Sequence, residues 1–318
     1  MRTKARASSL WELWAVWLLF TLAATAVLET YWRLPRSQLW KVTNSGLVGG
    51  TSRVLVFLSF SAALAAPAVL AIAADRLDTR RASALALVAT GLCASVAIPG
   101  VQTPGHLDAK WAQAPAVAGV VASIAITAWA TLRGRVEARR TTRTSDRARI
   151  AAGAIVLVAS APYIAAELGF FLDGVPLLGW LFQTGKPAPE PGAGYVHATV
   201  HHGHHHGLDG FLLASTFLLL SRLVPTIRRS RLGTITAAYL SLMLAYALAN
   251  LANDLWVEQV VKRGWTRWEI PDVLVPSASV GWGVILVAGA VVYVVVFRRR
   301  RPGRSARQGL GGTPAAQP

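Results

Sequence analysis

The sequence predicts an all-α, multi-pass membrane protein with about eight transmembrane helices and with both termini in the cytoplasm. Of the 318 residues, 53% are hydrophobic and only 15% are charged, a composition typical of integral membrane proteins. The apolar residues fall into runs of about 20, the length of helix that crosses the hydrocarbon core of a bilayer. Basic residues gather in alternate connections between these runs, as expected when positive loops stay in the cytoplasm.

The first run follows Arg2, Lys4 and Arg6, as the apolar segment of a signal peptide would. It is longer than a typical signal core, however, and it carries tryptophans, so we expect an uncleaved helix anchored at the membrane interface. The second run contains Pro67, which is expected to kink its helix without ending it. The predicted spans cover residues 10–28, 54–74, 82–98, 114–132, 150–172, a sixth run that follows the histidine-rich segment and ends near Ser221, 232–251 and 278–297.

The orientation follows from the distribution of arginine. Seven arginines lie between Arg133 and Arg149, a stretch too polar to enter the bilayer. When this stretch is placed in the cytoplasm, 23 of the 32 basic residues lie on the cytoplasmic side. Residues 1–297 then form one transmembrane domain, and the basic tail 298–318 is expected to be disordered and to lie against anionic lipid headgroups.

Composition also excludes some classes of partner and site. The formal net charge of +17 is as high as that of many nucleic-acid-binding proteins, but the basic residues flank apolar runs, so we expect no nucleic-acid partner. The single cysteine, Cys93, excludes an intrachain disulfide and a cysteine-based zinc site. Arginine outnumbers lysine by 27 to 5, a bias expected of a GC-rich bacterial genome. The predicted location is therefore the bacterial plasma membrane.

The histidine-rich segment 195–210 is the candidate functional site, because it holds six of the seven histidines. Imidazole is the commonest side-chain metal ligand. We expect this segment to be the external end of a helix that continues through the sixth run. On such a helix, one face would carry His197, His201 and His204. A second face would carry His202, His206 and Asp209, with His205 between these two faces. A third face would carry Gly203, Gly207 and Gly210. The glycine stripe predicts close packing against a neighbouring helix.

The histidine spacing resembles that of a known class of metal site. Residues 197–202 read H-x-x-x-H-H and residues 201–205 read H-x-x-H-H, similar to the histidine boxes of membrane-bound di-iron desaturases and hydroxylases. Those families carry several boxes spread along the chain, whereas this sequence carries one. We therefore do not assign the chain to them.

Two acidic residues are expected at the same depth as the histidines. Glu167 lies four residues after Tyr163 on the fifth run, and Asp254 belongs to a polar stripe with Tyr246 and Asn250. Acidic groups near a membrane span usually face the protein interior or a wet cavity. We expect Glu167 and Asp254 to act as catalytic bases, proton carriers or metal ligands. The predicted set of ligands for Zn²⁺, Fe²⁺ or Cu²⁺ is His197, His201, His202, His204, His205 and Glu167.

The leading hypothesis is thus a membrane protein with a transition-metal site at the external face. As an enzyme it would be an oxidoreductase, or a hydrolase in which a carboxylate assists a metal-bound water. One alternative is a metal-ion or proton-coupled transporter, or another metal-handling protein. A further alternative is a structural or assembly protein whose histidines form a solvated loop without metal.

Overall fold

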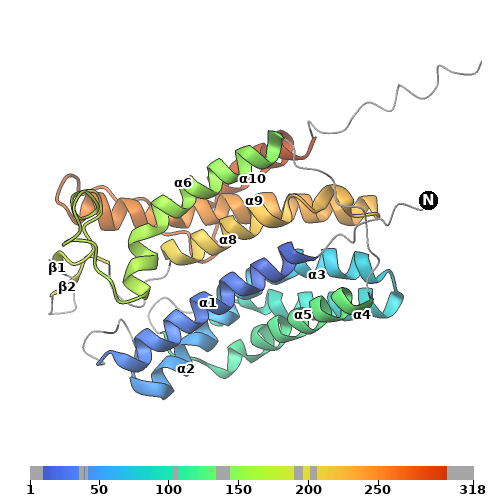
Figure 1. Cartoon of the computed structure of the whole chain (residues 1–318), viewed down its shortest axis with the longest axis horizontal. Coiled ribbons are helices and arrows are strands. Elements are labelled where there is room, and N and C mark those ends of the chain that lie inside the picture. The colour runs from blue at the N-terminus through green and yellow to red at the C-terminus, as the bar shows by residue number, and fades with distance from the viewer. Residues whose placement is uncertain are drawn as a thin grey trace, which may run out of the picture.

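A computed structural model describes residues 10–35, 39, 42–102, 107–133, 144–189, 196–200 and 206–298. These residues form a bundle of helices with one short two-stranded hairpin. The helices lie in two groups, and the chain passes from the first group to the second between α5 and α6 (Figure 1). The fold therefore confirms the predicted all-α class.

The first group contains the elements up to residue 133: α1 (Trp11–Arg33), α2 (Gly46–Phe57), the π-helical turn η2 (Leu58–Ala62), α3 (Ala63–Leu77), α4 (Arg80–Ala94), η3 (Ser95–Ala97), η4 (Trp111–Gln113) and α5 (Ala114–Arg133). The second group contains α6 (Thr144–Glu167), α7 (Leu178–Leu181), β1 (Pro187–Pro189), β2 (Val196–Ala198), α8 (His206–Leu220), η5 (Val224–Thr226), α9 (Ser230–Trp256), the π-helical turn η6 (Val257–Val261) and α10 (Val280–Val296).

Six of the described helices are long and apolar enough to cross a membrane: Trp11–Arg33, Gly46–Leu77, Trp111–Arg133, Asp146–Glu167, His206–Thr226 and Ser230–Val261. The apolar helix α10 is shorter, at 17 residues, and α4, with 15 residues, is not among the six. The structure thus supports a multi-pass membrane protein. The count of eight spans and the orientation of the termini stay predictions.

Tight packing of small side chains holds the first group together. Helix α3 is rich in alanine and buries almost all of its residues. Gly119 of α5 lies so close to α4 that a Cβ at this position would come within 2.8 Å of Cys93 N. Close approach of this kind is how helices associate in a membrane, where lipid removes most of the hydrophobic driving force.

The tryptophans of α1 differ from the expectation. Trp17 is only 4% exposed, and its Nε1 donates to Thr127 Oγ1 of α5 at 3.1 Å. Trp14 is partly exposed and donates to Thr131 Oγ1 at 2.9 Å. These indoles pair α1 with α5, and the buried Trp17 is not an interfacial anchor.

A non-helical segment, residues 262–279, runs back along α9 before α10 begins. Side chains of α9 and α10 donate to its carbonyl groups: Trp256 Nε1 to Trp268 O at 2.7 Å, Asn253 Nδ2 to Ile270 O at 2.6 Å, Tyr246 OH to Leu274 O at 3.1 Å and Trp282 Nε1 to Val275 O at 2.9 Å. From Val261 to Tyr246 the axis of α9 rises by roughly 22 Å, so this segment reaches deep beside the bundle. Non-helical backbone is tolerated at such depth only where the protein satisfies its polar groups.

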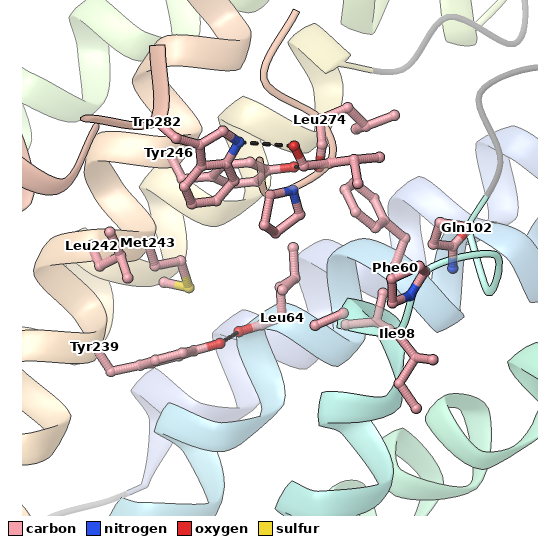
Figure 2. Close-up of a pocket in the computed structure, with 15 residues that line it drawn as sticks. Phe60, Leu64, Ile98, Gln102, Tyr239, Leu242, Met243, Tyr246, Leu274 and Trp282 are labelled. Atoms are coloured by element: carbon pink, nitrogen blue, oxygen red, sulfur yellow. Dashed lines mark hydrogen bonds between the residues drawn. The ribbon is translucent and has the colours of Figure 1, made fainter. Parts of the chain in front are cut away.

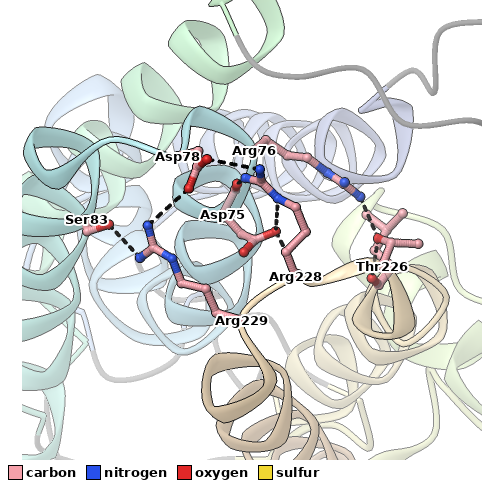
Figure 3. A network of polar contacts seen from close by, with 8 residues as sticks. Asp75, Arg76, Asp78, Ser83, Thr226, Arg228 and Arg229 are labelled. Carbon is pink, nitrogen blue, oxygen red and sulfur yellow. Dashed lines mark hydrogen bonds and ion pairs between the residues drawn. The ribbon is translucent and has the colours of Figure 1, made fainter.

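We call one end of the bundle the arginine end. It is the end at which α3 and α8 end and α9 begins. Here Arg228 spans from the α8–α9 connection to the first group, with Nε 3.5 Å from Asp75 Oδ2 and Nη1 3.1 Å from Asp78 Oδ2 (Figure 3). Arg229 reaches Ser83 Oγ at 3.0 Å. Arg76 Nη2 donates to Thr226 Oγ1 at 2.5 Å. These contacts tie the two groups of helices together.

Candidate functional site

The opposite end, where α6 and α9 end and α8 begins, is the histidine end. Helix α8 begins at His206, and the buried carboxylate of Asp254 caps it from α9. Gly207 N–H donates to Asp254 Oδ2 at 2.5 Å. The first N–H groups of a helix have no partner within it, and an N-cap side chain normally serves this position. A negative charge at a helix N-terminus is also favoured by the helix dipole.

The same carboxylate faces a histidine. His206 Nδ1 lies 4.0 Å from Asp254 Oδ1, and the side chain of Asp254 is fully buried. This distance is longer than a hydrogen bond. A carboxylate that moves within hydrogen-bond reach of one ring nitrogen fixes the tautomer of the imidazole and leaves the other nitrogen for a ligand, as in many metal sites. His206 was not in the ligand set predicted from the sequence, and the structure places its imidazole near Asp254.

Gly207 and Gly210 allow neighbouring helices to approach α8 closely. A Cβ at position 207 would lie 2.6 Å from Cε2 of Tyr163 on α6. A Cβ at position 210 would lie 2.7 Å from the carbonyl oxygen of Ala247 on α9. The predicted glycine stripe is thus confirmed at these two positions, whereas Gly203 lies outside the described residues.

The turn η6 continues the polar face of α9. Glu258, four residues after Asp254, is buried and pairs with Lys262 Nζ at 2.7 Å. Lys262 Nζ also donates to Thr199 O at 2.9 Å. Tyr163 lies within electrostatic range of both Asp254 and Glu258. The histidine end therefore holds several buried polar groups from α6, α8 and α9.

A hairpin lies over this end. Strands β1 and β2 pair antiparallel, with Ala188 opposite His197. Beyond β2, Thr199 N donates to Lys186 O at 2.8 Å and Val200 N donates to Thr184 O at 3.2 Å. Thr199 and Val200 are buried, so the chain enters the histidine cluster from an anchored position.

This hairpin overturns the predicted helix over residues 196–200, and residues 201–205 lie outside the described part of the chain. His197 belongs to β2, so it cannot share a helical face with residues four and seven positions further on. The β-branched residues Val196, Thr199 and Val200 favour the extended backbone found here. The predicted ligands His201, His202, His204 and His205 lie outside the described residues, and the structure describes only the backbone of His197.

Glu167 lies at the histidine end but faces other partners. It is the last residue of α6, is 5% exposed, and its carbonyl oxygen accepts from Thr30 Oγ1 of α1 at 2.5 Å. Its carboxylate is within electrostatic range of Tyr31, beside which the buried Arg53 also lies. In its described contacts Glu167 thus groups with α1 and α2, whereas Asp254 groups with α8.

Three buried charged residues were not predicted from the sequence as site residues: Asp209, Glu258 and Arg53. Asp209 is 7% exposed, and its Oδ1 accepts a hydrogen bond from Ser61 Oγ of the π-helical turn η2. An aspartate in the first turn of a strongly apolar helix is a usable signal, because its charge must find a partner inside the protein. Arg53 lies within an apolar helix, so its charge likewise indicates a partner inside the protein.

Among the residues that the structure describes, no three histidine, cysteine or acidic side chains gather as a metal-binding group. Residues 201–205, which contain four of the histidines, lie outside the described residues. Comparison of the chain with protein-family models, with curated proteins and with solved structures found no match.

Proposed function

We propose that this chain is a multi-pass membrane protein that binds a transition-metal ion at the histidine end of its bundle. The observation that carries the proposal is the pair of His206 and the fully buried Asp254 at the start of α8. In this arrangement Asp254 orients His206 through Nδ1 and leaves Nε2 for the ion. Most metal-ligating histidines donate their other ring N–H to a carboxylate, a backbone carbonyl or a water.

The remaining ligands come from the neighbouring histidines. Zn²⁺, Fe²⁺ and Cu²⁺ prefer imidazole nitrogen, with a carboxylate as an additional ligand. We therefore assign His201, His202, His204 and His205 as the candidate ligands, with His197 and Glu167 as further members of the set. The four histidines lie in the sequence between Thr199 and His206, and both of these residues lie at the histidine end. Thr199 O accepts from Lys262 Nζ, and His206 lies near Asp254. A bound ion of this class supplies Lewis-acid or redox chemistry, and Glu167 or Asp254 would hold the proton.

The distribution of buried charge supports a site at one end rather than a transport path. Among the described residues, the buried carboxylate and guanidinium side chains gather towards the two ends of the bundle: Arg53, Glu167, Asp209, Asp254 and Glu258 at one, and Glu12, Asp75 and Arg76 at the other. The described buried polar groups between them are uncharged near neutral pH, for example Ser123, Ser160 and Tyr246. No chain of buried charged groups therefore links the two ends among the described residues, and the metal-site hypothesis ranks above transport.

Metal content of the protein purified without a histidine tag tests the proposal. We expect the wild type to bind about one ion per chain and His206→Gln to lose it. Asp254→Asn keeps the shape but removes the charge that orients His206, so it should weaken binding by roughly 10–100-fold, as loss of such carboxylates does. Glu269→Gln is the matched control, because it neutralises an exposed carboxylate at the same end.

Two results would contradict the proposal. If the wild type takes up none of Zn²⁺, Fe²⁺ or Cu²⁺, the site does not exist. If His206→Gln and Asp254→Asn both bind metal as tightly as Glu269→Gln does, the pair is not part of the site.

We further propose that the histidine end faces away from the cytoplasm in a bacterial plasma membrane. The support is the concentration of arginine at the opposite end. Reporter domains fused after Arg140 and after Arg304 should read cytoplasmic, and one fused near Pro189 should read external. An external signal at Arg140 would invert the topology.

A further inference from the structure

An apolar cavity of about 130 Å³ lies between the two groups of helices (Figure 2). The first group contributes η2, α3 and the chain around η3, and the second contributes α9, the segment 262–279 and α10. Its walls include Phe60, Leu64, Ile98, Met243, Val275 and Trp282. None of these residues belongs to the proposed metal site.

The polar groups of the walls already have partners. Tyr239 OH donates to Leu64 O at 2.5 Å, and Tyr246 OH donates to Leu274 O at 3.1 Å. Trp282 Nε1 donates to Val275 O at 2.9 Å. A buried water needs two to four polar partners, and apolar cavities of roughly 150 Å³ stay dry and accept benzene-sized apolar guests. The chemistry of this cavity therefore suits a hydrocarbon.

The position of the cavity indicates where the hydrocarbon comes from. Tyr239 and Tyr246 lie in the middle of the span Ser230–Val261. The walls reach the protein surface at Ile98 and Val275, which are 57% and 43% exposed. At this depth a membrane-spanning bundle is surrounded by lipid tails. The mouth of the cavity thus faces the bilayer.

The backbone at the mouth explains why neighbouring helices do not close the gap. Residues 262–279 are not helical where they pass Tyr246, and α10 begins only at Val280. Tyr246 and Trp282 hold this segment in place, with their ring centroids 5.7 Å apart. On the opposite wall the π-helical turn η2 points Phe60 into the cavity while Ser59 accepts from Gln102 Nε2 at 2.9 Å. Turns of this kind are frequent at functional sites.

We propose that this cavity binds the end of an acyl chain of a membrane phospholipid, which enters from the bilayer between Ile98 and Val275. The volume fits the terminal part of one chain rather than a whole lipid. A bound chain contacts both groups of helices, so it links them at mid-depth, as the ion pairs do at the arginine end. This inference does not depend on a bound metal.

Photolabelling in a bilayer tests it. The full-length protein is placed in nanodiscs of phosphatidylcholine that contain a small, varied fraction of phosphatidylcholine with a diazirine near the end of one acyl chain. After illumination, labelled residues are mapped by mass spectrometry. Labelling of the cavity walls should be several-fold heavier than labelling of freely lipid-exposed side chains, because a bound chain end stays beside the walls. The reference side chains are Leu87 and Val88, which are 73% and 61% exposed on α4.

A pair of variants provides the matched control. Ala97→Phe adds a ring at a cavity wall, and Ala84→Phe adds the same ring on an exposed face of α4. We expect Ala97→Phe alone to lower the labelling of the cavity walls about tenfold at limiting probe, the equivalent of about 1.4 kcal/mol in binding. Equal labelling in both variants would overturn the proposal. So would wall labelling in the wild type that is no heavier than that of Leu87 and Val88, and this result needs no variant to fold.

Discussion

Replacing Gly207 with alanine should destabilise the protein through a single methyl group. The new Cβ would lie 2.6 Å from Tyr163 Cε2, whereas carbon atoms pack best at roughly 3.5–4.0 Å. The two helices or the ring must therefore shift by about 1 Å. Tyr163 is 2% exposed, so its ring lies inside the packed bundle. Overpacking of this kind costs about 1–3 kcal/mol.

The shift also strains the cap of α8. The N–H of Gly207 donates to the carboxylate of Asp254, and hydrogen bonds to charged groups contribute about 1.5–3 kcal/mol. Losing part of this bond brings the expected total to about 2–4 kcal/mol. For domains approaching this size, 1 kcal/mol corresponds to roughly 2–4 °C, so the unfolding temperature in detergent should fall by roughly 4–16 °C.

Gly153 provides the control for this variant. It lies within α6, and a Cβ there would meet only Leu218 Cδ1, at an ordinary 3.6 Å. Gly153→Ala should leave stability unchanged or raise it by up to about 1 kcal/mol, because alanine favours helix. Equal unfolding temperatures for Gly207→Ala and Gly153→Ala would show that the close contact of position 207 with Tyr163 does not limit stability. A Gly207→Ala, Tyr163→Leu double variant should lose less than the two single losses combined.

Two further predictions concern contacts distant from α8. Tyr246→Phe removes the donor to Leu274 O and should lower the free energy of unfolding by about 1–2 kcal/mol. Hydrogen exchange and proteolysis in residues 262–279 should become faster. Unchanged protection of this segment would contradict the role of Tyr246 in holding it. Arg228→Ala removes the guanidinium that pairs with the buried Asp75, although the backbone N–H of residue 228 still donates to Asp75 Oδ2, and it should cost about 1.5–3 kcal/mol. Arg229→Ala breaks a more exposed ion pair and should cost at most about 1 kcal/mol; equal unfolding temperatures would show that burial of Asp75 does not matter.

Hydropathy located the spans well but not their ends. The predicted run 232–251 ends where the polar residues of α9 begin, yet the helix continues to Val261 through η6. Polar residues end a predicted span because they are costly in lipid. In the structure these polar side chains are buried and hydrogen-bonded, so the cost does not arise. Asn253 donates to Ile270 O, Asp254 accepts from Gly207 N, and Glu258 accepts from Lys262 Nζ. Such partners lie on other elements and cannot be read from local sequence.

The cap of α8 was missed for the same reason. The sequence before His206 offers no clear local N-cap, because the cap is the carboxylate of Asp254, 47 residues away. The strand pairing of His197 with Ala188 likewise depends on a segment that reads as a proline-rich linker. By contrast, the glycine stripe was predictable, because the spacing of Gly207 and Gly210 is a local property. The importance of Asp254 also followed from its place in a polar stripe.

The division of the bundle into two groups has a consequence for biogenesis. The chain completes α1 to α5 before it enters α6, so the ribosome delivers the first group to the membrane as a unit. At that stage Ser61 and Asp75 still lack Asp209 and Arg228, the partners that the second group brings. Insertion and assembly are therefore separate steps, and a chain truncated after α5 should be recognised by quality-control proteases. Two halves produced as separate polypeptides, cut between Arg133 and Thr144, should reassemble in the membrane.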